Sequence, residues 1–377
     1  MEFKKQFKII LVVIGIMIFI QFLNSSIFYI KKHPKQKKES PKPKLLENFN
    51  SSNSNSNSNN RSLANPDYEG KEKQKINQTV RIKYLDKEEA FVFFNNLDYL
   101  TSMNSFNVRL RNNNNSNKSQ CIQKYYKSLL DFTSQDKNFL MNLISNIFER
   151  DIAHKNKDII KNFIAMMIPK IRFAKSNNWL ESGMPHTHKN VVFLPERFFN
   201  SSKSMISKES TIIHEIFHIY QRILLKIDPQ KLNTFYNHLN FIKTGYIHNF
   251  EEIRQRNRHN PDGININWNW TDPNHGGSYW IGAVFNYNTS NSIMDVKYLA
   301  YPLTKIENNH YRYEEFQKTI PLNKFYQFNK FFGIDNNHYH PNEITAQYME
   351  NLYLGEDLKN VGYQKFKNKI DSLLKMN

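Results

Sequence analysis

The chain has 377 residues, of which 39% are hydrophobic and 14% are aromatic, enough to form one large domain or two ordinary ones. Its one cysteine, Cys121, excludes an intramolecular disulfide and a cysteine-rich metal site, so any metal must be held by His, Asp or Glu. The formal net charge is +18, but the sequence has no zinc-finger spacing and no RNA-binding aromatic motif, and we expect no nucleic-acid partner.

The first 80 residues divide into an apolar segment and a polar segment. Lysines precede an almost wholly apolar stretch, 9–23, and apolar residues resume at 27–30, so residues 1–30 predict a signal anchor or a signal peptide. The absence of an A-x-A cleavage pattern favours an uncleaved, single-pass membrane anchor, with secretion as the alternative. Residues 31–80 are rich first in Lys and Pro and then in Ser and Asn, and they predict a disordered tether.

The orientation of this anchor stays open. Lysines directly after the apolar segment favour a cytoplasmic body under the positive-inside rule. Acceptor triplets for N-glycosylation favour the opposite orientation, and they begin at Asn77, Asn200, Asn269 and Asn288.

Residues 81–180 predict a helical N-terminal subdomain. Asp86 is a suitable N-cap residue for the first of its helices. The expected helices cover about 86–103, 120–132, 135–150 and 157–167. We find no catalytic pattern in this part of the chain, and we expect it to form scaffold or one wall of a cleft.

Residues 181–377 predict a second domain, in which the run 191–195 is expected to be a short strand. His186 and His188 precede it and are two residues apart, so an extended chain places them on one face. They could bind a metal, but we expect them to line a cleft as substrate-binding residues.

The stretch 211–222 carries the clearest motif, because His214-Glu215-Ile216-Phe217-His218 fits H-E-x-x-H. On a helix, residues four apart share a face, so His214 and His218 can present two imidazoles to one zinc ion. Glu215 lies where its carboxylate can reach a water on that metal. Apolar residues surround the three polar ones, and burying them is costly unless something pairs them.

The C-terminal part predicts further helices and a small sheet. A second helix is expected at 230–243, and strands are expected at 264–270, 279–285 and 297–301. A last helix begins near Pro341, where Asn342 is also a good helix-start residue.

Catalytic zinc keeps three protein ligands and one open position, so a third ligand is required. A metzincin would need Gly at position 221 and His at 224, but the chain has Gln221 and Leu224. The remaining candidates are Glu251, Glu252 and Glu343. Glu343 is expected in the first turn of its helix, where the dipole favours a carboxylate, whereas the neighbours of Glu251 look like an ordinary solvent-exposed helix.

Glu343-Ile-Thr-Ala-Gln347 resembles the E-x-x-A-E segment of gluzincins in the anthrax lethal factor group. That resemblance implies an α+β, mainly helical, zincin-like metallopeptidase domain with a small sheet in residues 181–377, behind the membrane segment and tether. It also implies that His214, His218 and Glu343 bind Zn²⁺. Gln347 departs from the usual Glu, and its expected role is a hydrogen bond to a zinc-binding histidine.

The implied function is hydrolysis of peptide bonds in a peptide or protein substrate, with Glu215 as the general base. Tyr339 is a candidate for contacting the substrate oxyanion, and it joins His186 and His188 as a predicted substrate-binding residue. Two alternatives remain: an inactive zincin-fold binding module, and a basic, membrane-tethered interaction protein in which the motif is accidental.

Overall fold

The computed structural model describes residues 81–95, 98–150, 157–262, 268–307, 309–333 and 338–375. All of them belong to one compact unit of the chain. The predicted membrane segment at 1–30 and the predicted tether at 31–80 lie outside the described residues. Among the helices that are described, none combines the length and the apolar character needed to cross a bilayer.

Helices dominate the described residues before position 170. They are α3 (Lys87–Asn95), α4 (Asp98–Ser102), α5 (Ser105–Arg111), α6 (Lys118–Lys127), α7 (Ser134–Glu149) and α8 (Lys157–Met167). The expected cap is confirmed, because Asp86 Oδ1 accepts from the Glu89 amide at 2.7 Å and Glu89 Oε2 accepts from the Asp86 amide at 3.1 Å. The helix expected at 120–132 ends earlier, at Lys127, and a short strand follows it.

A four-stranded sheet has the order β1-β2-β4-β3, with β1 at Leu129–Leu130, β2 at Arg172–Ser176, β3 at His186–His188 and β4 at Val191–Pro195. The predicted strand at 191–195 is confirmed, and it is buried along its whole length, as its continuous apolar run requires. Strand β3 is an edge strand, antiparallel to β4. The sheet takes strands from both sides of residue 180, and the boundary expected there stays a prediction.

The helix that carries the H-E-x-x-H motif is α10 (Met205–Ile227). It follows the short helix α9 (Glu196–Asn200) and precedes α11 (Pro229–His238). Ser204 caps α10 by accepting a hydrogen bond from the Ser207 amide. Apolar side chains on all sides of its central turns are buried, so α10 runs through the hydrophobic core.

A seven-stranded sheet follows in the sequence. Its strands are β5 (Phe241–Lys243), β6 (Tyr246–His248), β7 (Trp268–Thr271), β8 (Ser278–Val284), β9 (Lys297–Glu307), β10 (His310–Tyr313) and β11 (Ile320–Pro321). The order is β5-β7-β8-β9-β10-β6, with β11 paired to β9. The strands expected at 279–285 and 297–301 are confirmed, whereas residues 264–267 of the third expected strand lie outside the described residues. The sheet is larger than predicted, because short strands such as β5 and β6 have no clear sequence pattern.

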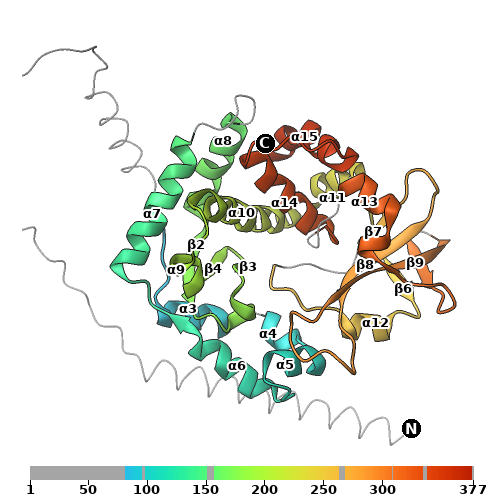
Figure 1. The fold of residues 1–377 in the computed structure, drawn as a ribbon, viewed down its shortest axis with the longest axis horizontal. Coiled ribbons are helices and arrows are strands. Elements are labelled where there is room, and N and C mark those ends of the chain that lie inside the picture. The colour runs from blue at the N-terminus through green and yellow to red at the C-terminus, as the bar shows by residue number, and fades with distance from the viewer. Residues whose placement is uncertain are drawn as a thin grey trace, which may run out of the picture. The chain divides into compact units, whose positions relative to one another are not determined.

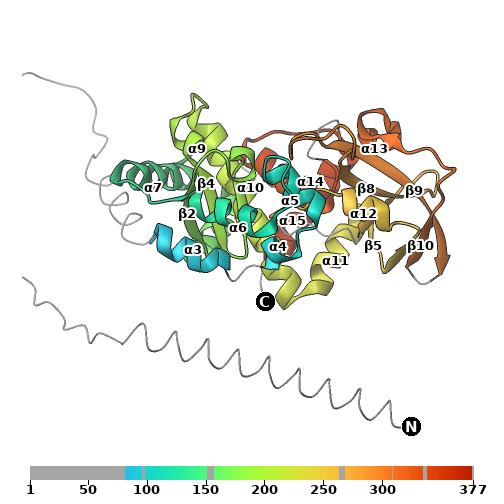
Figure 2. The same cartoon turned by 90° about the horizontal axis from the view of Figure 1, so that it is seen from below.

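The chain continues through α12 (Glu251–Arg256), which lies between β6 and β7 in sequence, and ends in α13 (Tyr326–Phe332), α14 (Pro341–Tyr353) and α15 (Val361–Leu374). The two sheets lie on opposite sides of this unit, with α10 and α14 between them (Figures 1 and 2). The structure is mixed α and β, with more described residues in helices than in strands. Helices α10 and α14 pack closely against each other, and this contact positions the candidate site.

Candidate metal centre

Three side chains from α10 and α14 converge on one point. His214 Nε2 and His218 Nε2 lie 3.1 Å apart. Glu343 Oε2 lies 3.7 Å from the first nitrogen and 3.6 Å from the second. Within the described residues these three form the group whose spacing suits a metal ion.

The triangle has the dimensions of a zinc site. Zinc–nitrogen and zinc–oxygen bonds of about 2.0–2.2 Å in a tetrahedron put neighbouring ligand atoms about 3.3–3.6 Å apart. The observed separations of 3.1, 3.6 and 3.7 Å bracket that range. Two imidazoles and one carboxylate are also a donor set that catalytic zinc uses, and three ligands leave a fourth position open. The residues present therefore fit a divalent metal.

The charges of the three groups agree with this geometry. Burial lowers the pKa of each imidazole, but nearby carboxylates outweigh burial: Glu343, Glu350 and Glu215 raise the pKa of His214, and chiefly Glu343 raises that of His218. Burial raises the pKa of Glu343, but the two imidazoles hold it well below its usual range. The carboxylate thus stabilises positive charge between the three atoms, which is what a bound cation would supply.

Local sequence explains the placement of each ligand. The spacing of four residues puts His214 and His218 on one face of α10. Helix α14 begins at Pro341, and the His340 side chain accepts from the Asn342 amide at 3.2 Å as an N-cap. Glu343 therefore stands in the first turn of α14, where the helix dipole favours a carboxylate.

The outer nitrogen of His218 has a fixed partner. His218 Nδ1 lies 3.0 Å from Gln221 Oε1, and an amide oxygen can only accept, so Nδ1 carries the proton and Nε2 is free for a metal. Gln221 Nε2 donates to Thr345 Oγ1 at 2.8 Å and to Asn342 O at 2.9 Å, which ties α10 to α14. Gln221, which stands where a metzincin would have Gly, thus orients the candidate ligand His218.

The outer nitrogen of His214 faces a carboxylate. His214 Nδ1 lies 3.4 Å from Glu350 Oε2, and Ser210 donates to Glu350 Oε1 at 2.7 Å. Gln347 was expected to fill such a role, but its Nε2 donates to Asn351 at 3.2 Å. That expectation was wrong because Glu350, two turns after Glu343 on the same face of α14, reaches the ring instead.

Glu215 lies beside the triangle but takes no part in it. Its side chain is buried, and Oε2 has no hydrogen-bond partner among the described residues. Burial, together with the nearby Asp262, raises the pKa of Glu215 to about 8. A buried carboxyl oxygen without a partner is costly, and buried carboxyl groups with a shifted pKa are characteristic of catalytic sites.

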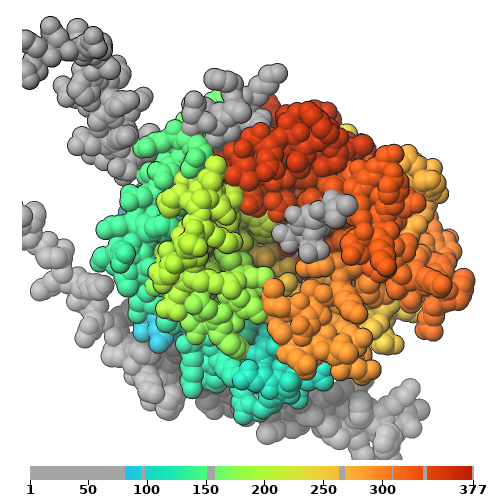
Figure 3. Space-filling model, viewed as in Figure 1, coloured from blue at the N-terminus to red at the C-terminus, as the bar shows by residue number. Residues whose placement is uncertain are grey.

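A cavity of about 160 Å³ reaches this site. The residues that line it are Glu181, Met184, Pro185, His186, His214, Glu215, Arg258, Asn260, Pro261, Asp262, Tyr298, Tyr339 and Glu343. They come from segments far apart in the sequence, and the face drawn in Figure 3 is hollowed between the green, orange and red segments to which they belong. His214 and Glu343, two of the three candidate ligands, thus share one cavity with Glu215.

The predicted substrate-binding residues lie in different surroundings. His186 lines the cavity; its Nδ1 is 2.9 Å from Met184 O, and its Nε2 has no partner among the described residues. Tyr339 also lines the cavity, and its hydroxyl accepts from Asn260 at 3.2 Å. His188 does not line the cavity: it lies against the rings of Tyr99 and a neighbouring phenylalanine. A substrate role for His188 stays a prediction that this position does not favour.

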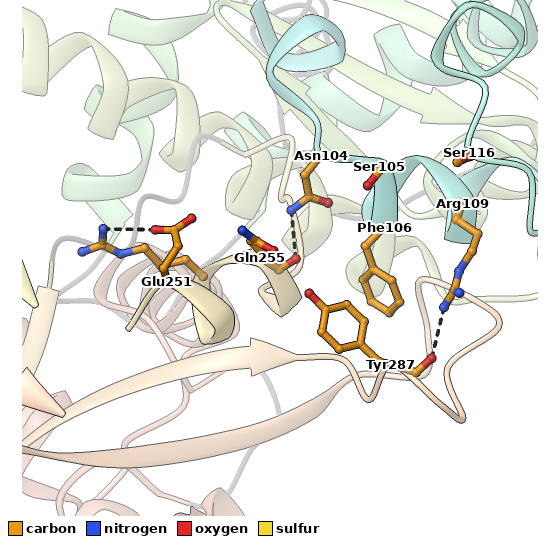
Figure 4. Close-up of a pocket in the computed structure, with 9 residues that line it drawn as sticks. Asn104, Ser105, Phe106, Arg109, Ser116, Glu251, Gln255 and Tyr287 are labelled. Atoms are coloured by element: carbon orange, nitrogen blue, oxygen red, sulfur yellow. Dashed lines mark hydrogen bonds and ion pairs between the residues drawn. The ribbon is translucent and has the colours of Figure 1, made fainter. Parts of the chain in front are cut away.

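The alternative third ligands lie elsewhere. Glu251 and Glu252 belong to α12, where their side chains are 71% and 76% exposed and pair with Arg254 and Arg256. Figure 4 shows Glu251 at a separate groove of about 680 Å³ that also includes Tyr287. The structure therefore brings Glu343, and neither alternative, to the histidines.

Several residues of the site were not predicted from the sequence. Asn260, in the segment that follows α12, donates to Glu343 Oε1 at 3.3 Å. Asp262 Oδ1 accepts from the amide and hydroxyl of Thr187 on β3, at 2.7 and 2.8 Å. No sequence pattern identifies such contacts, because they join segments more than 70 residues apart. Glu350 could have been found from the sequence, because it lies seven residues after Glu343 and therefore on the same face of the expected helix.

No protein-family model, no curated protein and no solved structure matches this chain. The geometry alone defines a class of site: two histidines and a glutamate with spacing that suits a divalent metal, and a separate carboxyl group in the same cavity with one unpartnered oxygen.

Proposed function

We propose that this protein is a zinc-dependent metallopeptidase of the gluzincin type. One observation carries the proposal: the three ligand atoms stand 3.1–3.7 Å apart while Glu215 Oε2, in the same cavity, has no partner among the described residues. A site that only stored or bound a metal would not require that buried carboxyl group.

His214, His218 and Glu343 would hold the zinc. Zinc bound there supplies Lewis-acid chemistry, which polarises a peptide carbonyl and lowers the pKa of water to about 7. Glu215 acts as the general base: its free oxygen takes a proton from the attacking water and then gives it to the leaving amine.

Two residues support the reacting carbonyl in this proposal. Tyr339 accepts from Asn260, and among the described residues its own proton has no acceptor, so it can donate to a developing oxyanion. His186 Nε2 is likewise buried and unpartnered at the cavity wall. Both residues can therefore contact the substrate without losing an existing hydrogen bond.

Zinc content and peptide cleavage of the full-length chain test the function. We expect about one zinc per chain and cleavage within a mixed peptide library. Glu215→Gln should retain the zinc and lose about 10²–10⁴-fold in kcat/KM, because it keeps the shape of the side chain but cannot take a proton. Glu343→Ala should lose zinc, whereas Glu251→Ala, the matched control on α12, should keep both zinc and activity.

The same measurements decide between the alternatives. Zinc retained without any cleavage would favour an inactive zincin-fold binding module. A wild-type chain that binds no zinc would favour an accidental motif in an interaction protein. Unchanged activity in Glu215→Gln would remove that residue from the mechanism.

A further inference from the structure

Arg258 is the arginine among the residues that line the catalytic cavity. It follows α12, and its backbone is fixed to the large sheet, because its amide donates to Ala283 O at 2.8 Å. Asn260, two residues later, donates to the metal-ligand candidate Glu343. The guanidinium thus belongs to a short segment that is anchored at one end to β8 and at the other to the metal centre.

Apart from Glu215, which the proposed function uses as the general base, the acidic residues that line the cavity already have partners. Glu181 Oε1 and Oε2 each accept from Arg111 at 3.1 Å. Glu343 faces the two histidines, and Asp262 accepts twice from Thr187. These carboxylates are therefore not free to neutralise a further cation.

Arg258 itself has no carboxylate within 4.0 Å in the ranges that the structure describes. Its Nε is buried without an acceptor, and the side-chain contact that it makes there is a weak one, from Nη2 to Met184 Sδ at 3.9 Å. A charged donor left unsatisfied in this way is destabilising. The arrangement is understandable if a ligand supplies the acceptor.

Arg222, close by on α10, shows how a structural arginine differs. Its Nε, Nη1 and Nη2 donate to Lys189 O, Asp262 O and Thr187 Oγ1 at 3.1, 2.6 and 2.6 Å. All three of its nitrogens are used to hold β3 against the 258–262 segment. Arg258 has no such set of acceptors, although it lies in the same part of the molecule.

We propose that Arg258 binds a carboxylate of the peptide substrate, beside the bond that is cleaved. The inference rests on the proposed peptidase function. A planar guanidinium offers two parallel N–H donors that match the two oxygens of a carboxylate. The cavity volume of about 160 Å³ equals about five water molecules at roughly 30 Å³ each. It has room for an Asp or Glu side chain, or for a C-terminal residue with its free carboxylate.

Matched peptides test the proposal and separate these two sources. One pair carries Glu or Gln next to the cleaved bond, and a second pair ends in a free acid or an amide. With the full-length, zinc-loaded chain we expect one pair to show a preference of about 10-fold or more in kcat/KM for the charged member. Arg258→Gln should reduce this ratio of kcat/KM values to about 1. Arg258→Lys should keep part of the preference, because lysine keeps the positive charge but lacks the two parallel N–H donors of a guanidinium.

Arg256→Gln is the matched control, since Arg256 is two residues away and pairs with Glu252 outside the cavity. It should keep the wild-type ratio, and melting temperatures should show that each variant is folded. Equal cleavage of both members of both pairs by the wild-type chain, or an unchanged ratio in Arg258→Gln, would overturn the inference and leave the peptidase proposal intact.

Binding gives a measurement that does not depend on turnover. In a Glu215→Gln background, fluorescence anisotropy of the same labelled peptides should show tighter binding of the charged member, and the added Arg258→Gln change should abolish the difference. The binding measurement does not require cleavage. If the peptidase proposal fails, the charged peptide should still bind more tightly, whereas if the Arg258 assignment fails, this preference should be absent. Binding that ignores peptide charge would contradict the assignment.

Discussion

The two imidazoles depend on the residues that hold their outer nitrogens. Gln221 accepts from His218 within the same helix, whereas Glu350 approaches His214 from α14. A carboxylate behind a metal-binding histidine fixes the ring and makes its other nitrogen a better ligand. Glu350 therefore gives the candidate metal centre an outer carboxylate, which Gln347 does not supply.

Glu350→Gln should weaken zinc binding by about 10-fold or more, because the ring of His214 loses a charged partner. Titration of zinc against a chelating competitor measures the change. Glu356→Gln, the same substitution six residues later at an exposed position, is the control and should bind as the wild type does. Equal affinity in both variants would show that Glu350 has no influence on the metal.

At the scale of elements, the site is the contact between α10 and α14. Glu343 and Glu350 both face α10, and Ala346 lies between them on the same stripe of α14. Ala346 is fully buried, and its small side chain allows the two helices to approach closely. The distance between the helices in turn sets the distance from Glu343 to the histidines.

Ala346→Leu should therefore reduce both stability and zinc affinity. Overpacking a tight core costs about 1–3 kcal/mol, and separating the helices moves Glu343 away from the histidines. Chemical unfolding and zinc titration measure the two effects. Met349→Leu, a buried change of nearly equal volume on the same helix, should cost less than about 1.5 kcal/mol and leave zinc binding unchanged. An Ala346→Leu variant that loses stability but keeps full zinc affinity would show that the spacing of α10 and α14 does not control zinc binding.

At the scale of the whole described unit, a buried ion pair joins distant segments to the cavity wall. Arg111 on α5 pairs with Glu181 and also donates to His259 O at 2.6 Å, across 148 residues of sequence. Tyr99 and Tyr125 donate to the same carboxylate. Glu181 has a φ of 44°, a left-handed conformation that is unfavourable outside glycine, and these contacts hold it there.

Arg111→Met should destabilise the protein by about 3–5 kcal/mol, because it leaves the Glu181 carboxylate buried without its cation. The double change Arg111→Met with Glu181→Gln should cost less than the single change. Urea unfolding measures both, with the exposed Arg172→Met as the control. A double variant as unstable as the single one would contradict this explanation.

The pair also predicts how stability depends on pH. Burial opposes ionisation of Glu181, but Arg111 outweighs it and holds the pKa of this carboxyl well below its usual value. A depressed carboxyl pKa contributes stability that is complete above the unfolded pKa, about 4.5, and is lost as the pH falls toward the folded value. The wild type should therefore lose more stability between pH 5 and pH 3 than Glu181→Gln does.

The sequence by itself determined the features that depend on one helix. Four-residue spacing places His214 and His218 together on any helix that forms, and Pro341 with Asn342 indicated that Glu343 would stand in a first turn. The short strands of the large sheet carried no comparable pattern, because neighbouring strands stabilise them and their own residues do not.

Only the tertiary structure decided which acidic residue meets the histidines and what surrounds them. Glu251 and Glu343 were both available in the sequence, and the packing of α14 on α10 selected Glu343. The unpartnered Nε of Arg258 and the contact of Asn260 with Glu343 could likewise not be predicted from the sequence. Spacing along a helix is set by local backbone geometry, whereas contacts between distant segments follow from how the whole core packs.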